Sequence, residues 1–135
     1  MKKYIKALML IFIIAIAVNA RVYAQTTWQL SQTVGNVECY YSMSTCNDNT
    51  VVLLKFVNKN KSNVTVKWKE VFETQFGAGV IGFFGAKEMT LVPGTTEQTN
   101  CSSTINPKCI IRGDQVHPAY IAKIQKFNFA EIIVN

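Results

Sequence analysis

The sequence has few of the side chains on which enzyme active sites depend. It contains one histidine, His117, and eight acidic residues in a chain of 135. Serine and cysteine hydrolases need a histidine base that a carboxylate orients, and no Gly-x-Ser-x-Gly segment is present. Glycoside hydrolases need two facing carboxylates in a cleft. We therefore expect a protein that is not an enzyme and has no cofactor, with His117 as a loop residue.

The sequence also lacks an apolar run of the roughly 20 residues that a membrane-spanning helix needs. Its apolar run from Ala7 to Val18 follows the basic segment MKKYIK and precedes NARVYAQ. A basic start, a short apolar core and a small-residue cleavage site are typical of a secretory signal peptide. We predict a signal peptide at residues 1–24, cleaved after Ala24 with Ala20 as second choice, and one secreted or periplasmic domain at 25–135. The Lys-Lys start indicates a bacterial source.

A strong basic excess is absent once this segment is removed. The full chain carries 14 basic and 8 acidic residues, for a net charge of +6. Four basic residues and no acidic ones lie in residues 1–24, so 10 basic residues remain against 8 acidic, or +2. Nucleic-acid binding domains carry a clustered basic face. We therefore expect no nucleic-acid partner.

Cysteine is scarce as well, with four residues: Cys39, Cys46, Cys101 and Cys109. Their spacings are wider than those of zinc knuckles, so we expect no metal site and, in an exported chain, two disulfides. Paired residues of antiparallel neighbours share one index sum, and 46 with 101 nearly matches 39 with 109, with a single β-bulge taking up the difference. We predict bridges 46–101 and 39–109, and local pairing of 39–46 with 101–109 is a close alternative.

What the sequence does have is strand periodicity. Residues 64–69 alternate in apolar and polar character, the period of a half-buried strand. In residues 51–57, Val52, Leu54 and Phe56 face one way, and the other side carries Val51, Leu53, Lys55 and Val57. The polar segment NKNKSN lies between the two segments. We predict that the two segments form a hairpin with the lysines on its solvated side. The predicted core anchors are Trp68, Val66, Phe56 and Leu54.

Further strand signals occur at residues 27–34, 37–46, 88–92, 95–101, 110–111 and 120–134. About seven short strands with turn signals between them predict an all-β, antiparallel β-sandwich. With its hairpin VLLKFVNKN…VTVKW and core tryptophan, the chain resembles immunoglobulin-like and fibronectin type III-like sandwiches. It also resembles short secreted proteins of Gram-negative bacteria that share this hairpin and a closing Phe-rich strand. The resemblance implies a fold and no activity.

The segment Phe76 to Ala86, FGAGVIGFFGA, is uncharged and contains four glycines. We interpret it as a packed strand and loop, as an exposed loop that docks a partner, or as a loop that enters a lipid interface. Its candidate interaction residues are Val80, Ile81, Phe83 and Phe84.

Two other sets of residues bear on binding. Trp28, Tyr40, Tyr41, Phe83 and Phe84 form a candidate aromatic platform for sugar. The tripeptide Arg112-Gly113-Asp114 matches an adhesive motif but is too short to carry weight. We expect a secreted, disulfide-stabilised, non-catalytic binding or structural module whose partner is an extracellular protein or glycan. The alternative is a small carbohydrate-binding or membrane-interacting factor that uses residues 76–86.

Overall fold

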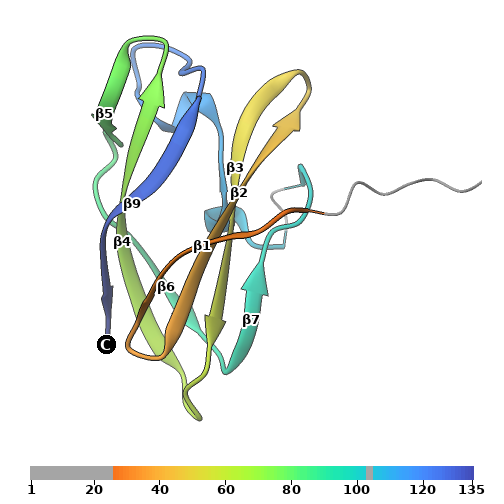
Figure 1. Ribbon diagram of the computed structural model, residues 1–135, viewed down its shortest axis with the longest axis vertical. Helices are drawn as coiled ribbons and strands as arrows, with labels where there is room; N and C mark the ends of the chain where they lie inside the picture. The colour runs from red at the N-terminus through yellow and green to blue at the C-terminus, as the bar shows by residue number, and fades with distance from the viewer. Residues whose placement is uncertain (1–25, 103–104) are drawn as a thin grey trace, which may run out of the picture.

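The computed structural model describes residues 26–102 and 105–135 (Figure 1). The predicted signal peptide and its cleavage site lie outside these ranges. Within the described part of the chain, no helix has the length and apolar character needed to cross a membrane.

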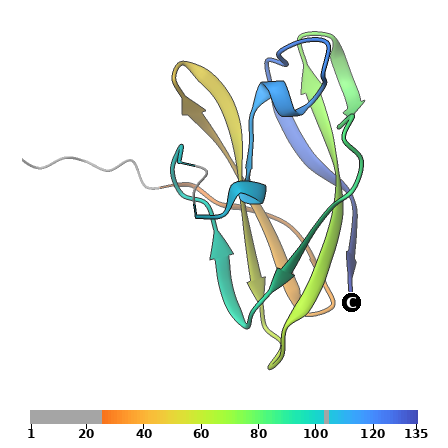
Figure 2. The same cartoon turned by 180° about the vertical axis from the view of Figure 1, so that it is seen from behind.

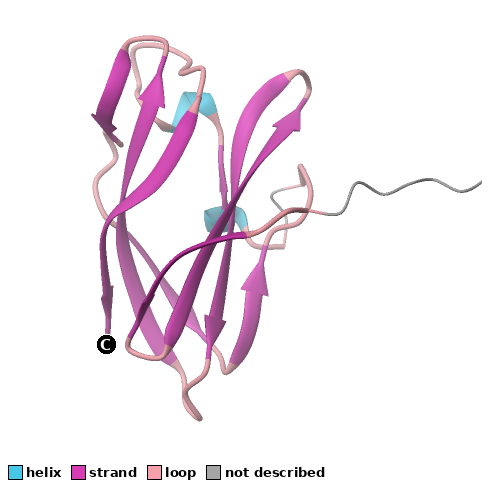
Figure 3. Ribbon diagram, viewed as in Figure 1, coloured by secondary structure: helices cyan, strands magenta, loops and turns pink. Residues whose placement is uncertain are grey.

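The chain forms two antiparallel sheets that face each other, as predicted for a β-sandwich (Figures 1 and 3). The first sheet has the order β1 (Gln29–Val34), β2 (Val37–Cys46), β3 (Asn49–Asn58) and β7 (Gly94–Glu97), and the short β8 (Ile110–Ile111) also pairs with β3. In the second sheet the central strand β4 (Val64–Thr74) pairs with β9 (Lys126–Val134) on one side. Its other side pairs with β6 (Lys87–Leu91) and then with β5 (Gly77–Ile81).

Two tight turns define the register of the first sheet. Gly35 and Asn36 connect β1 to β2 with φ angles of 53° and 58°, and Asn47 and Asp48 connect β2 to β3 with φ angles of 48° and 63°. Two consecutive residues with positive φ make a type I′ turn, whose twist matches that of the strands it joins. Glycine, asparagine and aspartate adopt this conformation at low cost.

The predicted hairpin between residues 51–57 and 64–69 is wrong. These segments belong to β3 and β4, which lie in different sheets and face each other across the core. The inward side of β3 packs on the inward side of β4, and the rings of Phe56 and Trp68 lie 5.2 Å apart. Residues 59–63 therefore span the gap of about 10 Å between packed sheets instead of closing a two-stranded ladder.

The alternation within β4 has the direction that its sequence predicts. Val66 and Trp68 are buried, whereas Lys67 and Lys69 are exposed on the outer face. Lys67 pairs with Glu88 at 3.3 Å and Lys69 with Glu131 at 2.7 Å. Because both lysines are exposed, they lie on the solvated side of the strand. Exposed ion pairs of this kind contribute little to stability.

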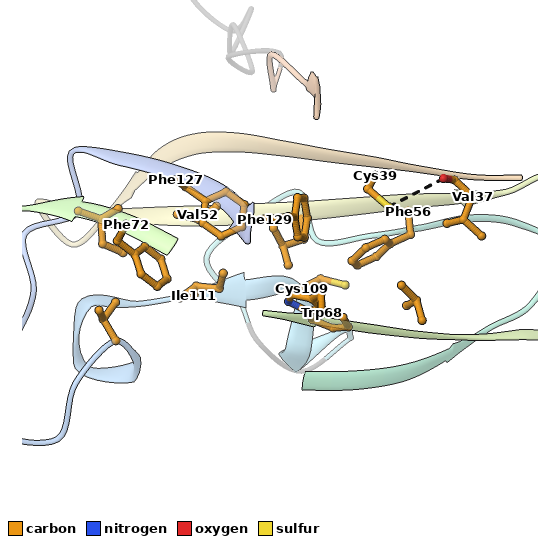
Figure 4. Close-up of a cluster of buried hydrophobic side chains, with 14 of the residues drawn as sticks. Val37, Cys39, Val52, Phe56, Trp68, Phe72, Cys109, Ile111, Phe127 and Phe129 are labelled. Carbon is orange, nitrogen blue, oxygen red and sulfur yellow. Dashed lines mark hydrogen bonds between the residues drawn. The ribbon is translucent and has the colours of Figure 1, made fainter. Parts of the chain in front are cut away.

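The main core lies between the sheets and is rich in aromatic rings (Figure 4). Phe56, Trp68, Phe72 and Leu54 are almost fully buried. Rings of about 150 to 250 Å² dominate the energetics of a core this small. The centre of the sandwich is therefore packed with side chains and is not hollow.

A second, smaller cluster lies on the outer face of the first sheet. It consists of Val51, Leu53, Ile110 and Cys46, with Trp28 packed against it. These β3 residues alternate with the core-facing ones, because neighbouring side chains of a strand point to opposite faces. The predicted Cys46–Cys101 disulfide is confirmed and attaches the segment after β7 beside this cluster.

The second predicted disulfide is not formed, and Cys39 and Cys109 are free, buried thiols (Figure 4). Cys39 lies on β2 opposite Phe56, whereas Cys109 immediately precedes β8 on the far side of β3. Two inter-strand spacings of about 4.8 Å separate such positions by about 10 Å, more than the roughly 7 Å that a disulfide can bridge. The predicted 39–109 pairing is wrong because the segments that carry these two cysteines are not neighbours: β3 lies between them.

Two 3₁₀ turns lie between the sheets on the side of the sandwich that Figure 2 brings forward. The first, η1 (Pro107–Cys109), leads into β8, and the second, η2 (Gly113–Gln115), follows it. The chain then runs through residues 116–125 to β9. This segment lies next to the end of β4 and the start of β5, where it helps to build the surface described next.

Candidate functional site

Five aromatic rings make a continuous row on the surface, which we call the aromatic ridge: Phe76, Tyr120, His117, Phe83 and Phe84. Phe76 contacts Tyr120 edge to face, with ring centroids 4.6 Å apart. His117 stacks on Tyr120 at 4.5 Å and meets the edge of Phe83 at 5.1 Å. Phe83 and Phe84 are perpendicular at 5.6 Å. Such pair geometries are favourable for aromatic rings, so the ridge is a packed surface rather than a set of independent side chains.

Backbone hydrogen bonds hold together the two segments that carry the ridge. The Phe83 amide donates to the Val116 carbonyl at 2.9 Å, and Gly82 N donates to Glu70 O at 3.0 Å. The Gln75 side chain donates to Ile121 O at 3.1 Å and accepts from Lys123 N at 2.7 Å. Residues 76–84 and 117–120 are thus placed side by side although about 40 positions separate them.

Most of the ridge is open to solvent. Phe76, Phe83 and Phe84 are 67%, 61% and 57% exposed, and the neighbouring Ile81 and Ile121 are 64% and 69% exposed. Contiguous exposed apolar surface on a folded domain marks sites of interaction. The row of rings is therefore the candidate binding surface of the part of the chain that the structure describes.

The structure divides the four candidate residues of the 76–86 segment. Ile81, Phe83 and Phe84 are exposed, whereas Val80 is partly buried and packs against the core. β5 is also bent by Gly77 and Gly79, which have φ angles of 118° and 76°. Segment 76–86 thus combines a short, glycine-bent edge strand with an exposed aromatic loop.

Three members of the ridge were not among the interaction residues predicted from the sequence: Phe76, His117 and Tyr120. His117 was expected to be a loop residue, and in the structure it lies between two rings of the ridge. Its Nδ1 accepts a hydrogen bond from the Ala119 amide at 3.1 Å, so this nitrogen is not held by a carboxylate as in a hydrolytic triad. The segment HPAY at 117–120, with two rings three residues apart, was the one local signal.

A buried ion pair lies beneath the loop that carries Phe83 and Phe84. Glu70 is 3% exposed, and its Oε1 accepts hydrogen bonds from Trp68 Nε1 at 3.1 Å and from Lys87 Nζ at 2.9 Å. A buried charge is tolerated only when it is paired and hydrogen-bonded. Glu70 therefore holds both ends of the loop, through its carbonyl to Gly82 at the start and through its side chain to Lys87, the first residue after the end.

The expected aromatic platform is split between three places. Tyr41 packs inward against Phe127 at 5.3 Å. Trp28 and Tyr40 lie on the outer face of the first sheet, where Lys55 Nζ sits 4.9 Å and 4.3 Å from their ring centroids. The Lys55 ammonium group already covers these two rings. Of the five residues expected in the platform, only Phe83 and Phe84 are therefore part of an open aromatic surface.

Charged neighbours fix the orientation of Tyr40. Its hydroxyl donates to Glu38 at 2.9 Å, and Lys59 pairs with the same carboxylate. The hydrogen bond from Lys59 lowers the pKa of Glu38 most, followed by the one from Tyr40. Donation to the carboxylate raises the pKa of Tyr40. Lys59 is exposed, and Glu38 and Tyr40 are only partly buried, so these contacts orient side chains more than they stabilise the fold.

The Arg112-Gly113-Asp114 segment is a packed corner and not a presented loop. Gly113 is buried, and a Cβ atom at this position would lie 2.2 Å from the carbonyl oxygen of Ala122. Arg112 Nη2 donates to the Cys101 carbonyl at 2.8 Å. The tripeptide thus serves the packing between β8 and the segment that leads to β9, and within the described ranges no group of three metal-ligating side chains is formed.

Comparison with protein-family models, with curated proteins and with solved structures finds no match to this chain.

Proposed function

We propose that the protein is a secreted or periplasmic binding module and that the aromatic ridge is its binding surface. The observation that supports this most directly is the contact of five rings in one row, three of them more than half exposed. Aromatic rings are usually buried when a domain folds, because each buried ring stabilises the core by several kcal/mol. A row left in water and held in place by backbone hydrogen bonds is best explained by a partner that covers it.

The proposed location agrees with the cysteine chemistry. The Cys46–Cys101 disulfide is consistent with an oxidising compartment, since disulfides persist outside the cytosol. The amino-terminal sequence supports export independently through its basic start and short apolar run. A protein that meets its partner outside the cytosol fits both features.

We also propose an immunoglobulin-like relationship for the sandwich. In immunoglobulin domains strands A, B and E share one sheet and strands C and F the other. Here β2, β3 and β7 are neighbours in the first sheet and β4 pairs with β9 in the second, and the buried Trp68 lies on β4 where strand C carries its tryptophan. The disulfide differs, because Cys46–Cys101 belongs to the outer face of the first sheet and not to the space between sheets.

The double substitution Phe83→Ser with Phe84→Ser tests the proposed binding surface. We expect the free energy of unfolding to change by no more than about 1 kcal/mol, because both rings are exposed. We expect the variant to lose a binding activity of the native protein, measured by surface plasmon resonance and co-sedimentation. The probes are neutral phosphatidylcholine vesicles, neutral oligosaccharides and proteins of the growth medium.

The matched control is Leu30→Ser, which removes an apolar side chain that is 53% exposed on β1, outside the ridge. It should bind like the native protein. Destabilisation of the Phe83/Phe84 variant by about 3 to 5 kcal/mol would show that the rings are core residues. Equal binding by that variant and the native protein would reject the ridge as the binding surface.

A further inference from the structure

Phe84, at the end of the aromatic ridge, forms one wall of a shallow hollow. Lys87, Asp114 and Gln115 complete the lining, and the hollow has a volume of about 270 Å³. Phe84 lies in the loop before β6 and Lys87 is the first residue of that strand, whereas Asp114 and Gln115 lie in the turn η2. The hydrogen bond from Phe83 N to Val116 O fixes the one against the other. An aromatic ring with three polar side chains around it is thus a defined feature of the surface.

The polar side chains of the hollow are held in different ways. Gln115 is oriented because its Oε1 accepts a hydrogen bond from the Arg112 amide at 2.8 Å, which leaves its NH₂ group as the donor end. Lys87 is anchored by Glu70 at 2.9 Å. Within residues 26–102 and 105–135, no hydrogen bond or ion pair to the Asp114 carboxylate is formed. The hollow therefore combines oriented donors with a carboxylate that has acceptor capacity to spare.

This combination discriminates between classes of partner. A lipid chain or an apolar peptide side chain that covered Phe84 would also remove water from Asp114 without replacing its hydrogen bonds, and burying an unpaired carboxylate is costly. A pyranose ring offers an apolar C–H face for the aromatic ring and hydroxyl groups around its rim. Those hydroxyls donate to a carboxylate and accept from an amide.

We propose that the hollow binds one pyranose unit of a neutral oligosaccharide, stacked on Phe84 with its hydroxyls on Asp114 and Gln115. This inference rests on the proposed role of the aromatic ridge as a binding surface. The following sugar units lie along Phe83 and His117, the next rings of the ridge. A neutral chain is specified because Lys87 already has its counter-charge in Glu70 and Asp114 is the free charge, so an anionic sugar is disfavoured.

The test uses the folded domain and three probes, cellohexaose, chitohexaose and maltohexaose, at millimolar concentration. Amide chemical shifts in ¹⁵N NMR spectra locate binding, and calorimetry measures affinity. We expect one of these probes to shift the amides of Phe84, Asp114 and Gln115. Phe84→Ser and Asp114→Asn should each weaken binding about tenfold, the loss expected for about 1.4 kcal/mol of contact energy.

Two matched controls remove similar groups elsewhere. Leu30→Ser lies on β1, and Asp48→Asn lies in the β2–β3 turn, where asparagine tolerates the positive φ. Neither should change sugar affinity. Because all four variants change exposed side chains, unchanged native spectra away from each site show that a loss of binding is not a loss of folding.

The outcomes separate this inference from the proposed function. If vesicles or a protein bind in a manner that depends on Phe83 and Phe84, while none of the three sugars shifts the Phe84, Asp114 and Gln115 amides, the sugar assignment is overturned and the binding surface remains. If a sugar binds with equal affinity to the native protein and to Asp114→Asn, the assignment to this hollow is also overturned. Sugar binding that survives the Phe83/Phe84 double substitution overturns both.

Discussion

At the scale of single residues, the reactivity of the two free cysteines tests how tightly the core is packed around them. Cys39 and Cys109 have no exposed surface, and burial raises the pKa of each thiol to about 12 because a thiolate there would lose its hydration. We predict that neither thiol of the native protein reacts with a disulfide reagent near neutral pH, and that both react in urea. The absorbance of the reagent's product measures how many thiols react. Reaction of the native protein would show that these residues are not tightly packed.

The same shift in pKa makes stability depend on pH in alkali. Thiols of the unfolded chain lose their protons near pH 9, whereas those of the native protein keep theirs to about pH 12. The native state then binds more protons than the unfolded state, so the free energy of unfolding falls as pH rises through this interval. Urea titrations at several pH values measure the slope, and the variant with Cys39→Ala and Cys109→Ala should have a smaller one.

At the scale of elements, the crossing from β3 to β4 depends on one buried amide. Asn58 is 2% exposed. Its side chain donates to Ser62 O at 3.0 Å and to Leu91 O at 3.2 Å, and accepts from Asn60 N at 3.0 Å. We predict that Asn58→Ala lowers the free energy of unfolding by about 1 to 3 kcal/mol, because buried partners are left without hydrogen bonds. Asn63→Ala, exposed in the same connection, is the control and should change stability by less than about 0.5 kcal/mol.

This crossing also shows where inference from the sequence stops. The alternation of Val66, Lys67 and Trp68 gives the buried face of β4, because strand side chains alternate regardless of partner. It does not state which strand lies beside β4. A connection of polar residues joins a hairpin as readily as it joins two sheets. In the crossing that forms, Asn58 is buried and bonds to Leu91 of β6, which lies 33 residues further along the chain.

Only part of the aromatic ridge could be predicted from the sequence, because a local pattern does not show which distant segment lies beside it. Phe83 and Phe84 stand out locally because they sit in an uncharged, glycine-rich segment. His117 and Tyr120 join them only because Phe83 N meets Val116 O and Gln75 bonds to both Ile121 and Lys123. No period or spacing encodes these contacts between distant segments. A set of side chains from one loop can be found by composition, whereas a surface shared by two loops needs the fold.

At the scale of the whole molecule, the Cys46–Cys101 disulfide serves a different hydrophobic cluster from the one between the sheets. The main core contains neither Cys46 nor Cys101, whereas the cluster of Val51, Leu53 and Ile110 contains Cys46. The bond closes a loop of 55 residues. Restricting the unfolded chain over such a length is worth about 4 kcal/mol in the entropic model and about 2 to 4 kcal/mol in typical measurements.

We therefore predict that reduction lowers the free energy of unfolding by about 2 to 4 kcal/mol while the sandwich stays folded. Equilibrium urea unfolding with and without dithiothreitol, followed by the fluorescence of Trp28 and Trp68, measures the loss. The variant with Cys46→Ala and Cys101→Ala is the control, because its stability should not respond to the reductant. If the reduced native protein loses its sheet signal in circular dichroism without urea, the two clusters form one cooperative unit that the disulfide holds together. Retention of the signal at reduced stability would show that the core between the sheets is sufficient for folding.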